Sequence, residues 1–296
     1  MQVKVYAKLN LTLGVGARQG SFHPIDSVAT SVDVSDVVEV VPRNDFEVCV
    51  SGVAGVEQEH NTAYKAARAF QSAFSTRGVD IQIRKGIPFG GGLGGSSADA
   101  AAVLFCMREL YKDDLGWENS PQLREKLMTI CSELGSDVTF MLRGGLGRLR
   151  GKGDDVEYFR LQRPLYFALT TFSQQMSSRE VYASFDHVCG KDAYRALEQD
   201  ANGKLLTELC CGNVSRALSH LCNDLQPATR AISSYADAYL QFTGANGLHS
   251  VMTGSGSAYF VAFETRAEAQ RAVDLLNLHG FSTTLCQTVP CGIDLD

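Results

Sequence analysis

The chain has 296 residues, 45% of them hydrophobic and 20% charged, and a formal net charge of −6 at pH 7. This length and composition suit one large or two medium globular domains with a sizeable core. The acidic balance argues against nucleic acid or an acidic membrane as the main partner. A local cluster of N–H groups and lysines could still bind an anionic small molecule.

The cysteine pattern and the lack of long apolar runs indicate in which cellular compartment the protein is expected. None of the nine cysteines forms a Cys-x-x-Cys pair, so we expect reduced thiols rather than disulfides or a zinc site. Residues 1–8 lack the apolar segment of a signal peptide, and no run of about eighteen apolar residues follows. These features predict a cytoplasmic protein, and no residue is assigned as a metal ligand.

In the first half of the chain, strict alternation of apolar and polar residues predicts a strand over 3–13. Short apolar runs predict further strands at 36–41, 46–50 and 79–83. Helical spacing predicts helices over 61–76, from a glycine-rich loop to about residue 111, over 123–134 and from 136–140 onward. Residues 144–153 are expected to form a turn with short strands.

The second half alternates between strand and helix patterns. Strands are expected at 165–171, 250–252, 259–263 and 281–289, and helices at 178–185, 214–222, 227–242 and 266–278. The whole pattern predicts an α/β (α+β) protein of two domains, residues 1–155 and 156–296.

Residues 88–102 hold the most informative motif, in which five glycines fall within residues 90–95 and an alanine-rich helix follows. Glycines let backbone N–H groups approach a ligand, and a helix start adds further N–H groups and partial positive charge. The pattern predicts a phosphate site made by Pro88, Gly90, Gly91, Gly92, Leu93, Gly94, Gly95, Ser96 and Ser97. A flexible glycine-rich hairpin is the plainer alternative.

Three details refine this prediction. Ser96 and Asp99 have the spacing of a capping box, which would set the start of the helix, and Ser97 offers a hydroxyl to a phosphate oxygen or a metal ion. The motif lacks the Gly-Lys-Ser/Thr ending of a Walker P-loop. It also lacks the acidic residue of a dinucleotide fingerprint.

Several segments together resemble the GHMP kinase superfamily, which is named for galactokinase and the homoserine, mevalonate and phosphomevalonate kinases. Within it, the likeness over nearly the whole chain is closest to the kinases of 4-diphosphocytidyl-2-C-methyl-D-erythritol. It rests on the glycine loop, Ala7-Lys8-Leu9-Asn10-Leu11, His23, Asn61, Leu134-Gly135-Ser136-Asp137-Val138, Asn223-Asp224-Leu225 and Gly254-Ser255-Gly256. The resemblance implies an N-terminal ribosomal-protein-S5-like domain, a C-terminal ferredoxin-like domain and an active site in the cleft between them.

The resemblance also implies site residues. Asp137 would be the base for the acceptor hydroxyl and Lys8 its charge partner, whereas the residues alone suggest a helix cap and a solvated lysine. Asn10, Phe22, His23 and Ser178 would contact the substrate, with Phe22 at a position where the family usually has a Tyr that stacks on cytosine.

Two residues are assigned to the nucleotide with alternatives left open. Asn61 is either an adenosine contact or only a helix N-cap, and Lys85 either reaches the adenine or phosphates or guards an edge strand. Residues 253–257 are expected to form a tight turn that supports the glycine loop or the substrate pocket.

The expected activity is transfer of phosphate from ATP, with Mg²⁺, to the 2-hydroxyl of 4-diphosphocytidyl-2-C-methyl-D-erythritol in non-mevalonate isoprenoid synthesis. A kinase for another alcohol, such as homoserine or mevalonate, and a non-catalytic ligand sensor of the same fold are the alternatives. The partner would be a small molecule, not a nucleic acid or a membrane, and the protein would be a monomer or homodimer.

Overall fold

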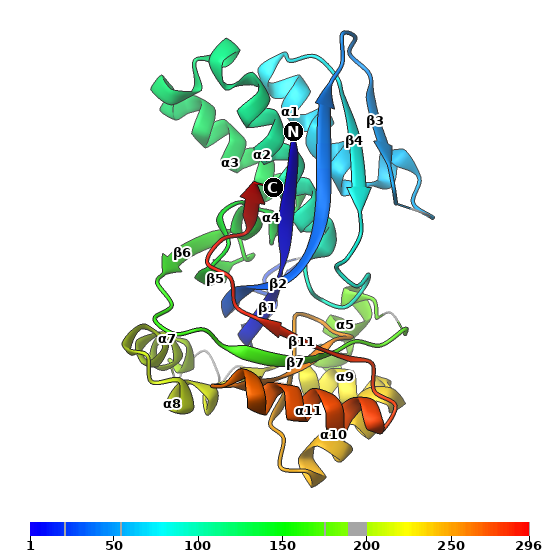
Figure 1. Ribbon diagram of the computed structural model, residues 1–296, viewed down its shortest axis with the longest axis vertical. Helices are drawn as coiled ribbons and strands as arrows, with labels where there is room; N and C mark the ends of the chain where they lie inside the picture. The colour runs from blue at the N-terminus through cyan, green and yellow to red at the C-terminus, as the bar shows by residue number, and fades with distance from the viewer. Residues whose placement is uncertain (21, 54, 175, 189–199, 296) are drawn as a thin grey trace.

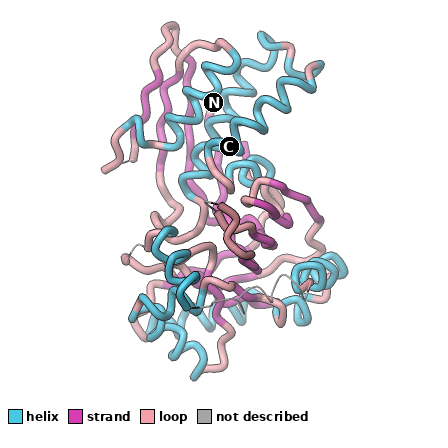
Figure 2. Tube along the Cα trace, turned by 180° about the vertical axis from the view of Figure 1, so that it is seen from behind, coloured by secondary structure: helices cyan, strands magenta, loops and turns pink. Residues whose placement is uncertain are grey.

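Two β-sheets, one above the other along the long axis, organise the computed structural model (Figure 1). The structure describes residues 1–20, 22–53, 55–174, 176–188 and 200–295. Both chain ends lie in the upper part (Figure 1). The view from behind shows one group of helices at each end of the molecule (Figure 2). None of the helices in the described ranges is long and apolar enough to cross a membrane.

The upper sheet is built on two long antiparallel strands, β1 (Gln2–Val15) and β2 (Ile25–Pro42). The second half of β2 pairs with β4 (Val79–Arg84), which pairs in turn with β3 (Val48–Ser51). The first half of β2 pairs with β5 (Leu146–Gly151), next to β6 (Asp155–Phe159). On its other side, β1 meets β12 (Ile293–Leu295) and, in parallel, β8 (Cys222–Asn223).

Strand β1 confirms the predicted alternation, but both of its faces are covered. The apolar face from Val3 to Leu13 is buried, as expected. On the opposite face, Lys8, Asn10 and Thr12 are at most 4% exposed. Buried polar groups need partners, so this polar face must be matched by other polar groups in the protein.

Three helices pack on the upper sheet: α1 (Thr62–Phe74), α2 (Gly95–Leu115) and α4 (Val138–Arg143). A further helix, α3 (Pro121–Leu134), packs on these helices. Helix α2 contacts β1, β2, α1 and α4. Its alanines at 98 and 100–102 are fully buried. Small side chains let α2 approach the sheet closely, so the start of α2 lies directly beside β1. Short 3-10 turns precede α1 (Gln58–His60) and follow α2 (Trp117–Asn119).

The lower sheet has the strand order β11-β7-β10-β9, with every pair antiparallel. Its strands are β7 (Tyr166–Thr170), β9 (Ser250–Met252), β10 (Tyr259–Phe263) and β11 (Thr283–Gln287). Helix α11 (Arg266–Leu278) packs on β7 and β10. The described residues of this half also form α5 (Ser178–Val188), α7 (Ala201–Cys211), α8 (Val214–Leu218), α9 (Gln226–Ile232) and α10 (Ser234–Ala245).

Some predicted elements were wrong in extent. The helix expected over 227–242 is two helices, because Ser233 takes an extended conformation and its side chain caps α10. The helix expected over 214–222 ends at Leu218, and the chain then enters β8. Strand β2 begins at Ile25 rather than residue 36, because buried polar residues such as Ser27 and Ser31 interrupt the apolar alternation on which the prediction depended. Elements β6, α7 and β12 were not predicted.

The two sheets separate close to the predicted boundary after residue 155. Strand β6 continues the upper sheet to Phe159, and β12 returns to that sheet from the C-terminal end. The division of the chain at 155/156 stays a prediction.

Helix α11 offers a matched test of the lower core, because Leu276 is fully buried and Leu278 is 82% exposed. We expect Leu276→Ala to lower the free energy of unfolding by about 2–5 kcal/mol, since it leaves a cavity, and Leu278→Ala to change it by less than about 0.5 kcal/mol. Urea denaturation of the two variants measures both values. Equal losses would contradict the packing described here.

Candidate active site

An open cavity of about 1000 Å³ lies between the two halves and is lined by residues from both. The upper half contributes β1, the glycine loop and the start of α4, and the lower half contributes α5 and the turn around Gly254. The lining contains all the predicted site residues except Asn61, namely Lys8, Asn10, Phe22, His23, Lys85, Pro88, Gly90, Gly91, Gly92, Leu93, Gly94, Gly95, Ser96, Ser97, Asp137 and Ser178.

The glycine loop is held through its carbonyl groups. Gly90 O accepts from Ser257 N at 3.4 Å, and Gly91 O accepts from Ala258 N at 3.2 Å. Leu93 O accepts from the backbone N–H of Lys8 at 3.0 Å. Within the described part of the chain, no N–H of residues 89–97 donates a backbone hydrogen bond. The loop therefore keeps its donors for a ligand, as expected of a phosphate site.

Glycine is required in this loop for two reasons. Gly90, Gly92 and Gly94 have φ of 72°, 72° and 75°, in the left-handed region that favours glycine. A Cβ on Gly92 would also lie 2.4 Å from the carbonyl oxygen of Thr253, and one on Gly94 would lie 2.2 Å from Met141 Cε. Gly92 thus passes too close to the backbone of the supporting turn for any other residue, while Met141 would have to move to admit a side chain at position 94.

The predicted capping box at Ser96 and Asp99 was wrong. Helix α2 begins at Gly95, its N-cap is Gly94, and no side chain caps it. Asp99 instead accepts a hydrogen bond from Lys85 Nζ at 2.8 Å. Ser96 and Ser97 line the cavity. The helix start therefore keeps its first N–H groups for a ligand as well.

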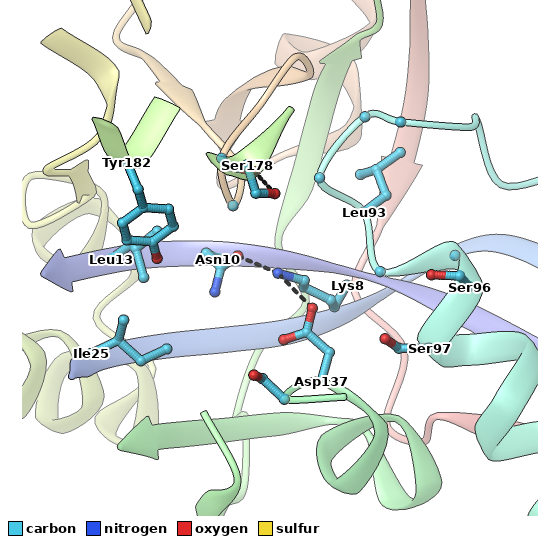
Figure 3. A pocket seen from close by; sticks show the side chains of 18 of the residues that line it. Lys8, Asn10, Leu13, Ile25, Leu93, Ser96, Ser97, Asp137, Ser178 and Tyr182 are labelled. Atoms are coloured by element: carbon cyan, nitrogen blue, oxygen red, sulfur yellow. Dashed lines mark hydrogen bonds and ion pairs between the residues drawn. The ribbon is translucent and has the colours of Figure 1, made fainter. Parts of the chain in front are cut away.

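Lys8 is the central charged group of the cavity (Figure 3). Its Nζ donates to Asn10 Oδ1 at 2.5 Å and lies 3.4 Å from Asp137 Oδ2. The Lys8 side chain is 5% exposed and that of Asp137 is 27% exposed. Asp137 precedes α4, but its side chain does not cap the helix. The carboxylate is thus held by the lysine and remains open to the cavity.

The far end of the cavity is aromatic. His23 Nδ1 donates to Gly16 O at 3.0 Å, its Nε2 lies 3.3 Å from Asp186 Oδ1, and its ring stacks on Tyr182 with centroids 5.3 Å apart. Lys152 Nζ lies 5.1 Å from the centroid of the Phe22 ring. Burial, followed by the nearby charge of Asp137, raises the pKa of Tyr182 to about 12, so its phenol is neutral at physiological pH.

Sequence reasoning missed Tyr182 and Asp186 as site residues. Both lie on α5 and line the cavity, as Ser178 does. Ser178 and Tyr182 are four residues apart and therefore share a face of the helix, which is the signal that could have found Tyr182. Ser178 Oγ also lies 2.7 Å from Ser255 Oγ, so the start of α5 meets the turn that supports the glycine loop.

Asn61 and Lys85 both bond to other groups of the protein. The Asn61 side chain accepts from Ala63 N at 2.8 Å, which confirms it as the N-cap of α1, while its contact with adenosine stays a prediction. Lys85 lines the cavity but bonds to Asp36 and Asp99. Burial raises the pKa of Asp99 to about 7, while the charge of Lys85 lowers it and that of Asp36 raises it.

The segment from Asn223 to Leu225 fastens the supporting turn. Asn223 Nδ2 donates to Met252 O at 2.7 Å and to Gly254 O at 2.8 Å, and Oδ1 accepts from Leu225 N. The expected tight turn at 253–257 that supports the glycine loop is confirmed. Asp224 accepts from Val15 N at 2.9 Å, and burial raises its pKa to about 6, although that hydrogen bond lowers it.

The fold and the cavity are those of a two-domain small-molecule kinase. Family models match residues 61–145, described as GHMP kinases N terminal domain, and residues 195–280, described as GHMP kinases C terminal. The chain belongs to the GHMP kinases.

Two similar proteins carry the same printed name, 4-diphosphocytidyl-2-C-methyl-D-erythritol kinase. The protein from Desulfitobacterium hafniense (strain Y51) is 31% identical over 299 residues, covering 99% of this chain and 97% of the relative. The protein from Brevibacillus brevis is also 31% identical, covering 93% and 92%.

Solved structures agree with the sequence relatives. The crystal structure of a 4-(cytidine 5'-diphospho)-2C-methyl-D-erythritol kinase has a TM-score of 0.74 and 25% identity, covering 98% of this chain and 100% of the other. A homoserine kinase from Cytophaga hutchinsonii has the same TM-score at 16% identity, covering 99% and 96%. That likeness extends to the fold alone.

The raised pKa of Asp224 predicts a pH dependence of stability. A carboxyl with a higher pKa in the folded than in the unfolded state binds its proton more tightly when folded. Its favourable contribution to the free energy of unfolding is therefore lost as pH rises from about 4 to about 6. We expect Asp224→Asn, which still accepts from Val15 N, to be more stable than wild type at pH 7 by about 1–2 kcal/mol after allowance for solvent screening.

The measurement is urea denaturation at several pH values from 4 to 7. The gain should shrink toward pH 4, where both side chains are neutral. Asp113→Asn, on an exposed residue of α2, should leave the slope unchanged. A constant gain at every pH would exclude Asp224 as the source.

Proposed function

We propose that this protein transfers the γ-phosphoryl group of ATP to the 2-hydroxyl of 4-diphosphocytidyl-2-C-methyl-D-erythritol, giving the 2-phosphate and ADP in non-mevalonate isoprenoid synthesis. The observation that carries the proposal is the Lys8–Asp137 pair, 3.4 Å apart, in one cavity with the glycine loop. The printed names of the relatives support this acceptor.

The chemistry follows from what the Lys8–Asp137 pair can do. Asp137 accepts the proton of the 2-hydroxyl while the hydroxyl oxygen forms a bond to the γ-phosphorus. The bond from that phosphorus to the bridging oxygen breaks, and ADP leaves with the electron pair. Lys8 offsets the charge that gathers on the attacking oxygen, and the N–H groups of the loop hold the phosphates in line.

The aromatic end of the cavity supports a nucleobase on the acceptor. Phe22 and Tyr182 offer ring faces, and His23 and Asp186 offer polar groups to the edge of a base. Stacking on aromatic rings and hydrogen bonding at the base edge together recognise an unpaired base. Homoserine and mevalonate have no base, so this end of the cavity favours the cytidyl acceptor over those alternatives.

Mg²⁺ fits the loop as an ion carried by the nucleotide. The described residues contain no group of three or more His, Cys, Asp or Glu side chains that could hold a metal. Mg²⁺ commonly binds through phosphate oxygens, waters and few protein ligands, and the Ser97 hydroxyl lies in the cavity lining. The ion would neutralise charge on the phosphates.

The remaining expectations concern the setting of the reaction. We expect the enzyme to act in the cytoplasm, as a monomer or homodimer, without a nucleic-acid partner. The free thiols of the eight described cysteines support the cytoplasm, and the net charge of −6 argues against a nucleic-acid partner.

Asp137→Asn tests the base. The amide keeps the shape but cannot take a proton, so we expect kcat to fall about 10²- to 10⁴-fold in a protein that still folds. The melting temperature should also fall, because Asp137 compensates the almost fully buried charge of Lys8. ADP release is measured with ATP, Mg²⁺ and the cytidyl acceptor, beside homoserine and mevalonate. Asp274→Asn, on an exposed residue of α11, should keep full activity.

The outcomes of this assay separate the candidate functions. Wild-type turnover of homoserine or mevalonate alone would contradict the proposed acceptor. ATP binding without turnover of any acceptor would favour the ligand sensor. Full activity of Asp137→Asn would exclude Asp137 as the base.

Phe22→Ala and Tyr182→Ala test the nucleobase end. Loss of one stacking face costs about 1–3 kcal/mol, so we expect the KM for the cytidyl acceptor to rise about 5- to 150-fold and the KM for ATP to stay constant. Phe46→Ala, on an exposed aromatic residue outside the cavity, is the matched control. A rise in the KM for ATP instead would assign these rings to the donor nucleotide.

A further inference from the structure

A buried carboxylate holds the entrance of the glycine loop. Asp36, on β2, is fully buried. Its Oδ1 accepts from Gly86 N at 2.7 Å and from Ile87 N at 2.8 Å, and its Oδ2 accepts from Lys85 Nζ at 2.5 Å. Charge-assisted hydrogen bonds of this kind are about twice as strong as neutral ones. Strand β2 thereby fixes the first residues after β4.

The same ammonium group also reaches the far end of the loop. Lys85 Nζ donates to Asp99 Oδ2 at 2.8 Å. Asp99 is the fifth residue of α2 and is 5% exposed. One lysine thus bridges the strand side and the helix side of residues 86–95. Lys85 lines the cavity, whereas neither Asp36 nor Asp99 is among the lining residues.

A glycine-rich loop needs such support because its backbone has many conformations to lose. Ordering the backbone of one residue costs about 1–2 kcal/mol, and glycine loses the most freedom. A ligand that meets an already ordered loop does not have to supply this free energy from its own contacts. Contacts at both ends of the loop therefore contribute to ligand affinity without touching the ligand.

We propose that Asp36 and Asp99 are positioning residues that, through Lys85, hold the glycine loop in its nucleotide-binding conformation. The proposal rests on the proposed function, because the ligand of the loop is taken to be ATP or ADP. We call the group of Asp36, Lys85 and Asp99 the clamp. Lys85 acts in it chiefly by joining the two carboxylates.

The clamp and a direct contact of Lys85 with the nucleotide predict opposite changes in nucleotide affinity when a carboxylate is removed. If Lys85 acted only as a phosphate or adenine ligand, removing a competing carboxylate would free its ammonium and strengthen nucleotide binding. If the clamp orders the loop, replacing either carboxyl group by an amide weakens its hydrogen bond to Lys85, which loosens the loop and weakens nucleotide binding. The direction of the change in affinity therefore separates the two roles.

Asp36→Asn and Asp99→Asn test the clamp by titration calorimetry with ADP and Mg²⁺. We expect the Kd for ADP to rise about tenfold in each variant, and the KM for ATP to rise with it, while the KM for the cytidyl acceptor stays constant. Asp33→Asn is the control, because exposed Asp33 lies on the same strand and also accepts a backbone N–H, from Gln287. It should bind ADP as wild type does.

Hydrogen exchange of the unliganded protein supplies a second measurement that needs no nucleotide. We expect the Gly86 and Ile87 amides to exchange slowly in wild type and the peptide spanning residues 86–97 to exchange faster in Asp99→Asn. If Asp36→Asn fails to fold, Asp99→Asn decides, since Asp99 accepts one hydrogen bond where Asp36 accepts three.

Unchanged or tighter ADP binding together with unchanged exchange in Asp99→Asn would overturn the clamp. Failure of the proposed function looks different. Wild type would then leave the cytidyl acceptor unphosphorylated, while the exchange of residues 86–97 would still respond to Asp99→Asn and support the clamp.

Discussion

The architecture of the site depends on the place where strand β1 meets the glycine loop at Lys8. The backbone N–H of Lys8 donates to Leu93 O, and its ammonium bonds Asn10 and faces Asp137. Lys8 therefore holds the glycine loop against strand β1 and places a positive charge beside the Asp137 carboxylate. Because the Lys8 side chain is almost fully buried, these partners must stay in place if the charge is to be compensated.

The loop itself is ordered by contacts on its carbonyl side. Backbone N–H groups of the turn at 253–258 and of strand β1 donate to the carbonyl groups of Gly90, Gly91 and Leu93. Asn223 in turn fastens that turn, because its Nδ2 donates to the carbonyl oxygens of Met252 and Gly254. Residues of the lower half thus hold a loop of the upper half, and the loop N–H groups remain directed to a ligand. Such an arrangement lowers the entropy that binding would otherwise cost.

The two ends of the cavity have different chemistry, and this difference separates the fold from its function. A homoserine kinase shares the fold with a TM-score of 0.74, so the arrangement of strands and helices says little about the acceptor. The aromatic end, with His23 stacked on Tyr182, is what gives the cavity a place for a base. The loop end is suited to phosphate chiefly through backbone N–H groups.

Local patterns in the sequence determined the strand at 3–13 and the glycine loop that precedes a helix, because periodicity and backbone sterics act between near neighbours. The resemblance to GHMP kinases also placed Lys8 and Asp137 in one site. Only the tertiary structure decided that Asp99 leaves its expected cap for Lys85, that Asp36 joins them, and that Tyr182 lies against His23. These partners are far apart in the chain, and a buried charge takes the counterion that the fold brings near it rather than the one that is close in sequence.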